Sequence, residues 1–303
     1  MNDNAKAMVL ASFAADSLAL GAHWIYDTAV ITNDIGRVEG LRPPVAGSYH
    51  ATKNLGDFTH YGDQTLVLLE SIAESPGFDL GNFARHWQLL CSDYQGYLDH
   101  ATKDTLNNFA AGKSPSDSGS ASTELGGGSR VAPLVYVYSD DLEKLIVGVR
   151  QQTAMTHNDP DVIAGTEFLA ATAWYALKGT PPVSAMKKLL PEGTLQNSIL
   201  KGLESSTMGT KQAIKRFGQS CHSSDALPSV VHLIAKYEDD LKEALVENVM
   251  AGGDSAARGM LVGMVLGAHL GPDAVPTDWL EKLTYHRKIN DLLQMIDGFK
   301  AHS

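Results

Sequence analysis

The sequence is poor in cysteine and in positive charge. Cys91 and Cys221 are the only cysteines among 303 residues, so the chain has neither a disulfide framework nor a metal-binding cysteine pair. This usage fits a reducing compartment, and we expect a cytoplasmic protein. There are 24 Lys and Arg against 35 Asp and Glu, and the formal net charge is −11. That balance argues against nucleic acid or a membrane as partner, because surfaces for nucleic acid or anionic lipid need clustered Lys and Arg.

Long hydrophobic runs and strand-like alternation are also scarce. Asp16 interrupts the apolar stretch 8–24, which lacks the basic start and cleavage site of a signal peptide and so indicates a buried helix. The stretch 260–270 is far shorter than the roughly 20 residues that span a bilayer. No segment alternates with period two for long, and no repeat period is found. We therefore predict an all-α protein, with residues 1–303 forming a single compact multi-helix domain.

Helical spacing of apolar residues, by contrast, occurs along most of the chain. It predicts helices over 5–22, 66–72, 78–98, 105–111, 142–156, 162–177, 183–190, 194–203, 226–236 and 241–250, and a further helix that begins near Asp254. Residues 28–59 lose this spacing and collect Pro and Gly, which predicts a long irregular loop. Long ordered loops often line functional sites.

The stretch 252–268 is the most informative. Two glycines deliver Asp254 to the start of a helix, where its carboxylate can accept the unpaired amide hydrogens of the first turn. A helix cap alone would explain this residue. Farther along, Gly259, Gly263 and Gly267 lie four apart, so a neighbouring helix can approach closely. Asp63 stands near the start of another helix in the same way.

Other candidates are less specific. Asp16 lies inside an apolar helix and needs a polar partner there. The Gly-rich and Ser-rich segment 112–128 precedes a helix, and such a loop can offer backbone amides to an anion, although a mobile surface loop is the more common outcome. His157 falls at the turn between two predicted helices, before Asp159 and Pro160.

In this order the motifs resemble the ADP-ribosylglycohydrolase family, and within it the branch of the jellyfish J-type crystallins, over nearly the full length. The family's C-terminal Gly-Gly-Asp motif aligns with residues 252–254, and its aromatic-Thr-Asp-Asp-Thr motif aligns with residues 61–65. The first-helix Asp aligns with Asp16, the Thr-His step with residues 156–157, and the glycine-rich Arg segment with residues 126–130.

The resemblance implies hydrolysis of a glycosidic bond to ADP-ribose by two magnesium ions in a cleft among helices. Several ligand positions differ here, because Gly62 replaces a Thr, Gln64 replaces an Asp, and Ala256 and Ala257 replace an Asp and a Thr. His23 stands at the position of the catalytic glutamate.

We therefore expect at most one Mg²⁺, held by Asp63 and Asp254 with the Gln64 carbonyl and water, since Mg²⁺ prefers oxygen ligands. Alternatively, Arg258 would neutralise Asp254 and leave a cleft without metal.

The resemblance also assigns site residues. Asp63, Asp254 and His23 would surround the scissile bond of a nucleotide sugar or an ADP-ribosylated substrate. The residues expected to bind the substrate are Asp16, Tyr61, Gly62, Gln64, Gly126, Gly127, Gly128, Ser129, Arg130, His157, Gly252, Gly253 and Ser255. Two rivals stay open: a catalytically inactive, crystallin-like structural or ligand-binding protein, and a metal-independent hydrolase of an N- or O-glycoside with His23 as acid or base. The sequence does not specify an oligomeric state.

Overall fold

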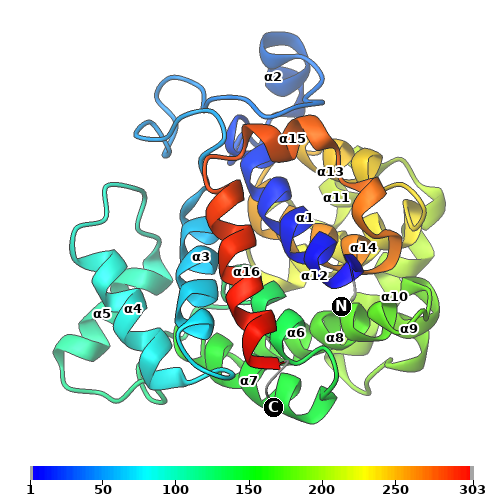
Figure 1. The fold of residues 1–303 in the computed structure, drawn as a ribbon. Coiled ribbons are helices and arrows are strands. Elements are labelled where there is room, and N and C mark those ends of the chain that lie inside the picture. Colours follow the sequence, from blue (N-terminus) through cyan, green and yellow to red (C-terminus); the bar gives the residue numbers. More distant parts are fainter. Residues whose placement is uncertain (1–2, 301–303) are drawn as a thin grey trace.

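Two apolar helices that are far apart in the sequence pack lengthwise at the centre of the molecule. They are α1 (Asp3–Leu20) and α14 (Ser255–Leu270), which Figure 1 shows crossing the middle of the fold. A Cβ on Gly263 would lie 2.6 Å from the carbonyl oxygen of Ala11, so the two backbones can meet this closely only at glycine. The predicted role of the glycine stripe is thus confirmed.

The other helices surround this pair in the computed structural model, which describes residues 3–300. They are α2 (Thr28–Val30), α3 (His60–Ala73), α4 (Leu80–Ser92), α5 (His100–Ala110), α6 (Ala132–Val137), α7 (Leu142–Ala154), α8 (Pro160–Leu177), α9 (Pro182–Lys188), α10 (Thr194–Glu204), α11 (Thr210–Phe217), α12 (Ser223–Lys236), α13 (Leu241–Met250), α15 (Thr277–Lys282) and α16 (His286–Lys300), with a π-helical turn at Ile31–Ile35 and 3₁₀ turns at Leu125–Gly127, Ser205–Thr207 and Pro272–Ala274. Residues 3–300 contain isolated β-bridges but no strand, which confirms the all-α prediction.

Helix boundaries differ from the prediction around α4 and α5. A single helix is predicted over 78–98, but α4 ends at Ser92 and a loop follows. Helix α5 begins at His100, five residues before the predicted start, because Asp99 caps it by accepting a 2.6 Å hydrogen bond from the amide of Thr102. This cap places Asp99 at the edge of the site described below.

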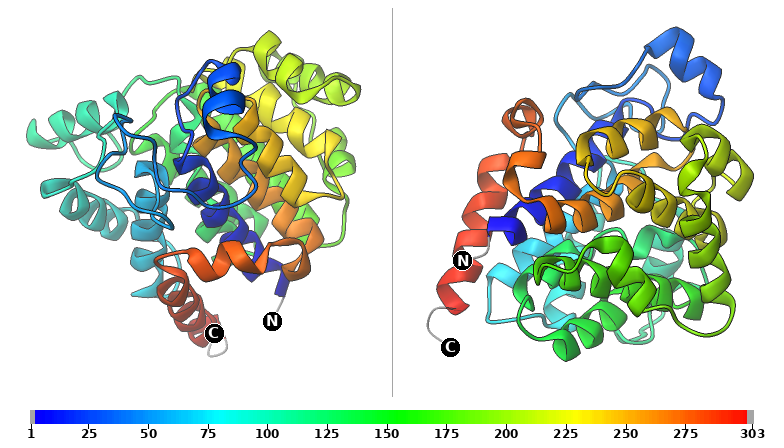
Figure 2. Two further views of the ribbon diagram at one scale, coloured as in Figure 1. Left: turned by 90° about the horizontal axis from the view of Figure 1, so that it is seen from above. Right: turned by 90° about the vertical axis from the view of Figure 1, so that its right-hand side faces the viewer.

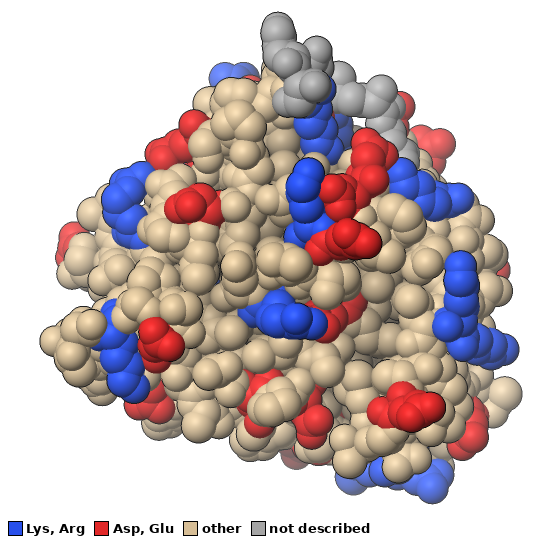
Figure 3. Space-filling view, turned by 90° about the horizontal axis from the view of Figure 1, so that it is seen from below, with Lys and Arg blue, Asp and Glu red and all other residues tan. Residues whose placement is uncertain are grey.

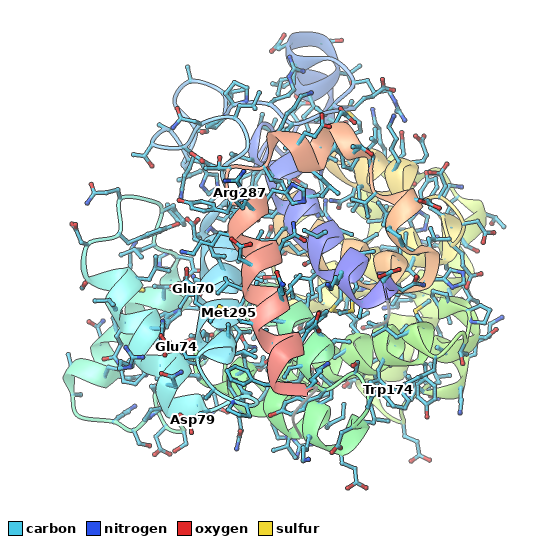
Figure 4. The ribbon with its side chains drawn as sticks, viewed as in Figure 1. Glu70, Glu74, Asp79, Trp174, Arg287 and Met295 are labelled. Atoms are coloured by element: carbon cyan, nitrogen blue, oxygen red, sulfur yellow. The ribbon has the colours of Figure 1, made fainter. Side chains whose placement is uncertain are left out.

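Helix α16 was not predicted from the sequence. It lies along α3, and Figure 4 shows Glu70 of α3 and Met295 of α16 on the same side of the molecule. Lys288 of α16 forms an ion pair with Glu70. The buried residues of α16 include Ile289, Leu293 and Ile296, which recur at helical spacing. The signal for this helix was therefore present in the sequence.

The segment between the π-helical turn and α3 lies across the end of α1, as seen from above in Figure 2. Arg37 fixes its start through ion pairs with Glu243 at 2.7 Å and Glu247 at 2.6 Å on α13. Gly56 fixes its end, because its carbonyl accepts a 3.0 Å hydrogen bond from the amide of Thr284. The irregular loop predicted over residues 28–59 instead begins with helical turns at Thr28–Val30 and Ile31–Ile35. Its remainder, residues 36–59, is irregular but ordered, and we call it the covering loop.

The surface carries charges of both signs. On the face that Figure 3 shows, Lys and Arg side chains are interspersed with Asp and Glu. Within residues 3–300, no helix combines the length and apolar character that crossing a membrane requires.

Candidate functional site

The end of α1 and the beginnings of α3 and α14 meet beneath the covering loop. Gly252 and Gly253 have φ angles of 71° and 70°, and the backbones of Ile25 and Gln219 lie too close for a Cβ on either glycine. The amide of Gly253 donates to the Ile25 carbonyl at 2.8 Å, and the amide of Trp24 donates to the Gly253 carbonyl at 3.0 Å. The predicted glycine turn therefore ties the start of α14 to the end of α1.

Asp254 is both a helix cap and the hub of a buried hydrogen-bond cluster. Its Oδ1 accepts from the amide of Ala257 at 3.3 Å and lies 2.9 Å from Nε2 of His23, while Oδ2 accepts from the Tyr61 hydroxyl at 3.1 Å. Burial alone would raise the pKa of Asp254, but the His23 hydrogen bond and the positive charge of Arg258 outweigh burial, so the pKa is lowered. The carboxylate is therefore ionised. The expectation of a cap is confirmed, and a role for Asp254 in catalysis stays a prediction.

His23 has a second partner that was not predicted from the sequence. Its Nδ1 lies 2.8 Å from Nε2 of His50, which the covering loop supplies. Burial lowers the pKa of both imidazoles. The ring of Trp24 stacks on His23 at 4.2 Å between centroids, and Trp24 is the one non-glycine residue with positive φ in the described part of the chain, at 63°. Such strained residues are often found at functional sites.

Arg258 does not neutralise Asp254 by direct pairing, so that expectation is corrected. Its Nε donates to Oδ1 of Asn248 at 3.1 Å, and one terminal nitrogen donates to the Gly252 carbonyl at 2.6 Å. Arg258 points back into the glycine turn because the carbonyls of Asn248 in α13 and of Gly252 in that turn accept its hydrogen bonds. Instead, His23 is the side chain that donates a hydrogen bond to Asp254.

Asp63 does not cap its helix. The cap of α3 is Thr59, whose hydroxyl accepts from the amide of Tyr61 at 3.2 Å. Asp63 lies one turn inside the helix, and its Oδ2 accepts from Nζ of Lys53 and from the Tyr94 hydroxyl, both at 2.5 Å. Burial raises the pKa of Asp63, against the effects of Lys53 and Tyr94.

These contacts do not fit a magnesium ion. Mg²⁺ needs several oxygen ligands in octahedral geometry, but the ammonium of Lys53 already lies on the Asp63 carboxylate. The Gln64 carbonyl, expected as a further ligand, accepts from Nε1 of Trp87 at 2.9 Å and from Arg130. Nor does any group of three or more His, Cys, Asp or Glu among residues 3–300 have the arrangement of a metal site.

Asp16 finds the partner that its burial requires. It accepts from the amide of Thr59 at 2.7 Å and from the Thr59 hydroxyl at 2.5 Å. A Cβ on Gly62 would lie 2.4 Å from Oδ2 of Asp16, so the glycine at this position makes room for the carboxyl group. Burial raises the pKa of Asp16 to about 7. In this structure Asp16 fixes the start of α3 and does not touch Asp254 or His23.

The glycine-rich segment is buried and is not a surface loop at residues 126–130. A Cβ on Gly126 would meet the Tyr61 ring at 2.5 Å, and one on Gly127 would meet the His157 ring at 2.6 Å, so these glycines allow close packing. A Cβ on Gly128 would meet the hydroxyl oxygen of Thr166, and the Ser129 hydroxyl donates to the Gly126 carbonyl at 2.7 Å. The segment therefore reaches the site through Tyr61.

Arg130 binds protein groups with all three guanidinium nitrogens, donating to Gln64, Gln152 and Thr156. A role in holding phosphate stays a prediction for this segment. His157 binds the Thr156 hydroxyl through Nδ1 at 2.9 Å, and its buried Nε2 has no hydrogen-bond partner among the described residues. The hydroxyl of Ser255 is buried and unpartnered in the same way.

Four residues complete the site without having been predicted. His50 and Lys53 come from one turn of the covering loop, in which the amide of Lys53 donates to the His50 carbonyl at 2.9 Å. His60 lies 3.2 Å from Oδ2 of Asp99 through its Nε2. For Asp99 the sequence did carry a signal, an Asp directly before a helix. For His50 and Lys53 the sequence carried no such signal. Their segment lacks the regular spacing of apolar residues from which the direction of a side chain could be predicted.

Comparisons with known proteins agree with this architecture. A solved structure described as an ADP-ribosylglycohydrolase-related protein complex superposes with a TM-score of 0.76 at 22% identity, over 98% of both chains, which shows the same fold. A profile of the ADP-ribosylglycohydrolase family matches residues 1–302. The chain therefore belongs to the ADP-ribosylglycohydrolase family.

Two curated relatives are similar to this chain in sequence. Crystallin J1A of Tripedalia cystophora is 24% identical over 95% of this chain and 94% of its own. The ADP-ribosyl-[dinitrogen reductase] glycohydrolase of Rhodospirillum rubrum is 38% identical, but over only 21% of each chain. The first relative supports similarity over the whole length, and the second supports it over a short segment.

Proposed function

We propose that this protein hydrolyses the glycosidic bond of an ADP-ribosyl or related nucleotide-sugar substrate, and that the Asp254–His23 pair rather than a metal ion activates the attacking water. The observation that carries this proposal is the 2.9 Å contact between Oδ1 of Asp254 and Nε2 of His23, with both side chains at most 1% exposed. A buried carboxylate that orients an imidazole is a recurrent means of making a proton acceptor.

The pair would act on the bond between the anomeric carbon and the leaving nitrogen or oxygen. The water oxygen attacks the carbon, the leaving atom departs with the bonding electrons, and the proton released by water passes to the imidazole system. Tyr61 holds the second oxygen of Asp254, so the carboxylate keeps one orientation while the charge on the imidazole changes. Each of these steps uses residues of this chain.

Aromatic rings lie beside the Asp254–His23 pair, and a planar group of a ligand could stack on them. The centroids of Trp24 and Tyr97 are 4.9 Å apart, and Tyr49 lies 5.2 Å from each of them. Tyr49 is 64% exposed, whereas His23 is buried, so the ring cluster runs from the surface towards the imidazoles. Stacking on these rings would hold the base of a nucleotide sugar near the Asp254–His23 pair.

The test is release of ADP-ribose from peptides modified through N-glycosidic and O-glycosidic bonds, with 5 mM EDTA or with Mg²⁺ at about physiological concentration. We expect release that EDTA does not reduce and that Asp254→Asn lowers at least about a hundredfold. Release that requires Mg²⁺ would contradict the metal-free mechanism. Asp239 is exposed and lies in the turn before α13, so Asp239→Asn provides the matched control.

A second candidate, a catalytically inactive protein resembling crystallins, is favoured by the ion pair of Lys53 with Asp63. That pair occupies a carboxylate that the family resemblance assigns to metal. A calorimetric titration with ADP-ribose distinguishes the two candidates when no release is seen. Binding would indicate a ligand-binding protein, and absence of both binding and release would indicate a structural one.

A further inference from the structure

The hydrogen bonds of the two imidazoles fix their tautomers. Asp254 is an acceptor only, so Nε2 of His23 must carry the proton between them. A neutral His23 then presents the lone pair of Nδ1 to His50, and the 2.8 Å contact requires that Nε2 of His50 donate. A neutral His50 is left with a lone pair on Nδ1. Donation therefore runs in one direction, from His50 to His23 to Asp254.

Nδ1 of His50 is the open end of this chain. It is buried and has no hydrogen-bond partner among residues 3–300, and the whole residue is 1% exposed. A buried acceptor without a donor is costly, so such an atom indicates a place for a donor that binds. The rings of Trp24, His60 and Tyr97 surround His50 at centroid distances of 5.5, 5.9 and 6.5 Å. These rings shield the imidazole from bulk water.

From this geometry we infer that His50 Nδ1 is the atom that takes the proton from the attacking water, with His23 and Asp254 holding His50 in the required tautomer. This inference rests on the proposed function. As the bond from the water oxygen to the anomeric carbon forms, the bond to the leaving atom breaks and its electrons go to that atom. The water proton moves to His50 and from there to the leaving atom, so the net reaction adds one water.

The surroundings of His50 determine whether its imidazole is free to accept a proton. Burial lowers the pKa of His50, and His23, His60 and Lys53 lower it further. These effects lower the pKa of His50 to about 2, so the imidazole is neutral in the resting protein with its lone pair free, but it is a weak base that holds the proton only during the step in which the glycosidic bond breaks. The imidazolium formed during the reaction faces the Asp254 carboxylate through His23, and Asp254 supplies the negative charge that stabilises it.

Two variants separate the base from its hydrogen bond. His50→Gln keeps an amide donor for His23 but has no base, so we expect kcat for the ADP-ribosyl peptide to fall at least about a hundredfold with KM within about threefold. His50→Ala leaves space, and imidazole added to the buffer should restore part of its activity. The matched control His269→Gln lies at the far end of α14 and should keep wild-type kcat. Wild-type kcat in His50→Gln would overturn the inference, as would failure of imidazole to restore a folded His50→Ala.

A second readout does not depend on activity. Nitrogen-15 NMR of histidine-labelled protein reports which ring nitrogen carries the proton, and the single variants assign the signals. We expect protons on Nε2 of both His23 and His50, and an unprotonated Nδ1 on His50. A proton on Nδ1 of His50 would overturn the inference. A wild type that releases no ADP-ribose would overturn the proposed function and the catalytic role of His50 together, while the NMR result would still decide the direction of the hydrogen-bonded chain.

Discussion

Three of the buried carboxyl groups of the site, Asp16, Asp63 and Asp254, differ in their partners and therefore in their charge. Asp254 is stabilised as an anion by His23 and Tyr61. Asp63 has a cation, Lys53, at 2.5 Å, whereas Asp16 has only the two hydrogen bonds from Thr59. Neutral donors offset less of the cost of burying a charge than a cation does. Each carboxyl group should consequently respond differently to pH and to substitution.

Asp16 should make the protein less stable as pH rises. Burial raises its pKa to about 7 in the folded state, above the ordinary value of 3.8 for an aspartate side chain. The folded state therefore holds the proton more tightly, and this contribution to stability is complete below pH 4 and is lost as pH rises towards 7. Asp16→Asn should remove this part of the pH dependence, because an amide can accept from the Thr59 amide and donate to the Thr59 hydroxyl. Urea unfolding at pH 5 and pH 8 measures it, and a variant that is less stable than the wild type at pH 8 would contradict the prediction.

Lys53 should stabilise the fold through Asp63. Lys53→Met would leave a buried carboxylate with Tyr94 as its only donor, and we expect a loss of about 2 kcal/mol in the free energy of unfolding at pH 8. Because burial already raises the pKa of Asp63, the variant should bind a proton more readily, and the loss should shrink at pH 5. The double variant with Asp63→Asn should recover part of the stability. An equal loss at both pH values would show that Lys53 acts by packing alone.

At the scale of elements, the sequence predicted helices well where one face is apolar and gave less guidance where a single contact ends a helix. The close approach of α1 and α14 follows from glycines spaced four apart, and the structure confirms it. The break between α4 and α5 depends on the Asp99 cap, and helical spacing alone placed this break too far along the chain, at residues 99–104. The course of the covering loop depends on distant partners, Glu243 and Thr284, that no local pattern contains.

The end of the covering loop should tolerate substitution poorly. Gly56 has φ of 86°, and a Cβ there would lie 1.9 Å from the Lys282 carbonyl oxygen. Gly47 in the same loop has φ of 78° but nothing within 4 Å of a Cβ, so it is a matched control. Gly47→Ala should cost about 1 kcal/mol from backbone strain, and Gly56→Ala should cost about 2 kcal/mol more because the backbone of Lys282 must move. Equal losses in chemical denaturation would show that the loop end can shift freely.

At the scale of the whole molecule, part of the site could be predicted because the motifs of the family occur in this chain in the same order. Tyr61 and Asp254 were predicted from motifs at two helix starts, and His23 from the end of a third helix, and the structure brings these residues into hydrogen-bond contact. His50 and Lys53 could not be predicted, because their positions depend on how 24 residues without helical period cross three helix ends. Whether a metal ion fits the site depends on Lys53. The ligand residues alone are compatible with one Mg²⁺. The position of the Lys53 ammonium on the Asp63 carboxylate argues against that ion.

Magnesium should therefore leave the stability of the whole protein unchanged. A ligand that binds only the folded state stabilises it by RT ln(1 + [L]/Kd), which is about 4 kcal/mol at 1,000 times Kd. Here Asp63 is paired with Lys53 and Asp254 with His23, so an incoming ion must first displace an existing partner. We expect the Tm in 10 mM MgCl₂ to stay within about 1 °C of the Tm in EDTA at matched ionic strength, with and without ADP-ribose. A Tm that rises by several degrees and saturates with Mg²⁺ would show that the ion displaces the Lys53 ammonium. It would then favour the metal-dependent reaction that the family resemblance implies over proton transfer through the imidazoles.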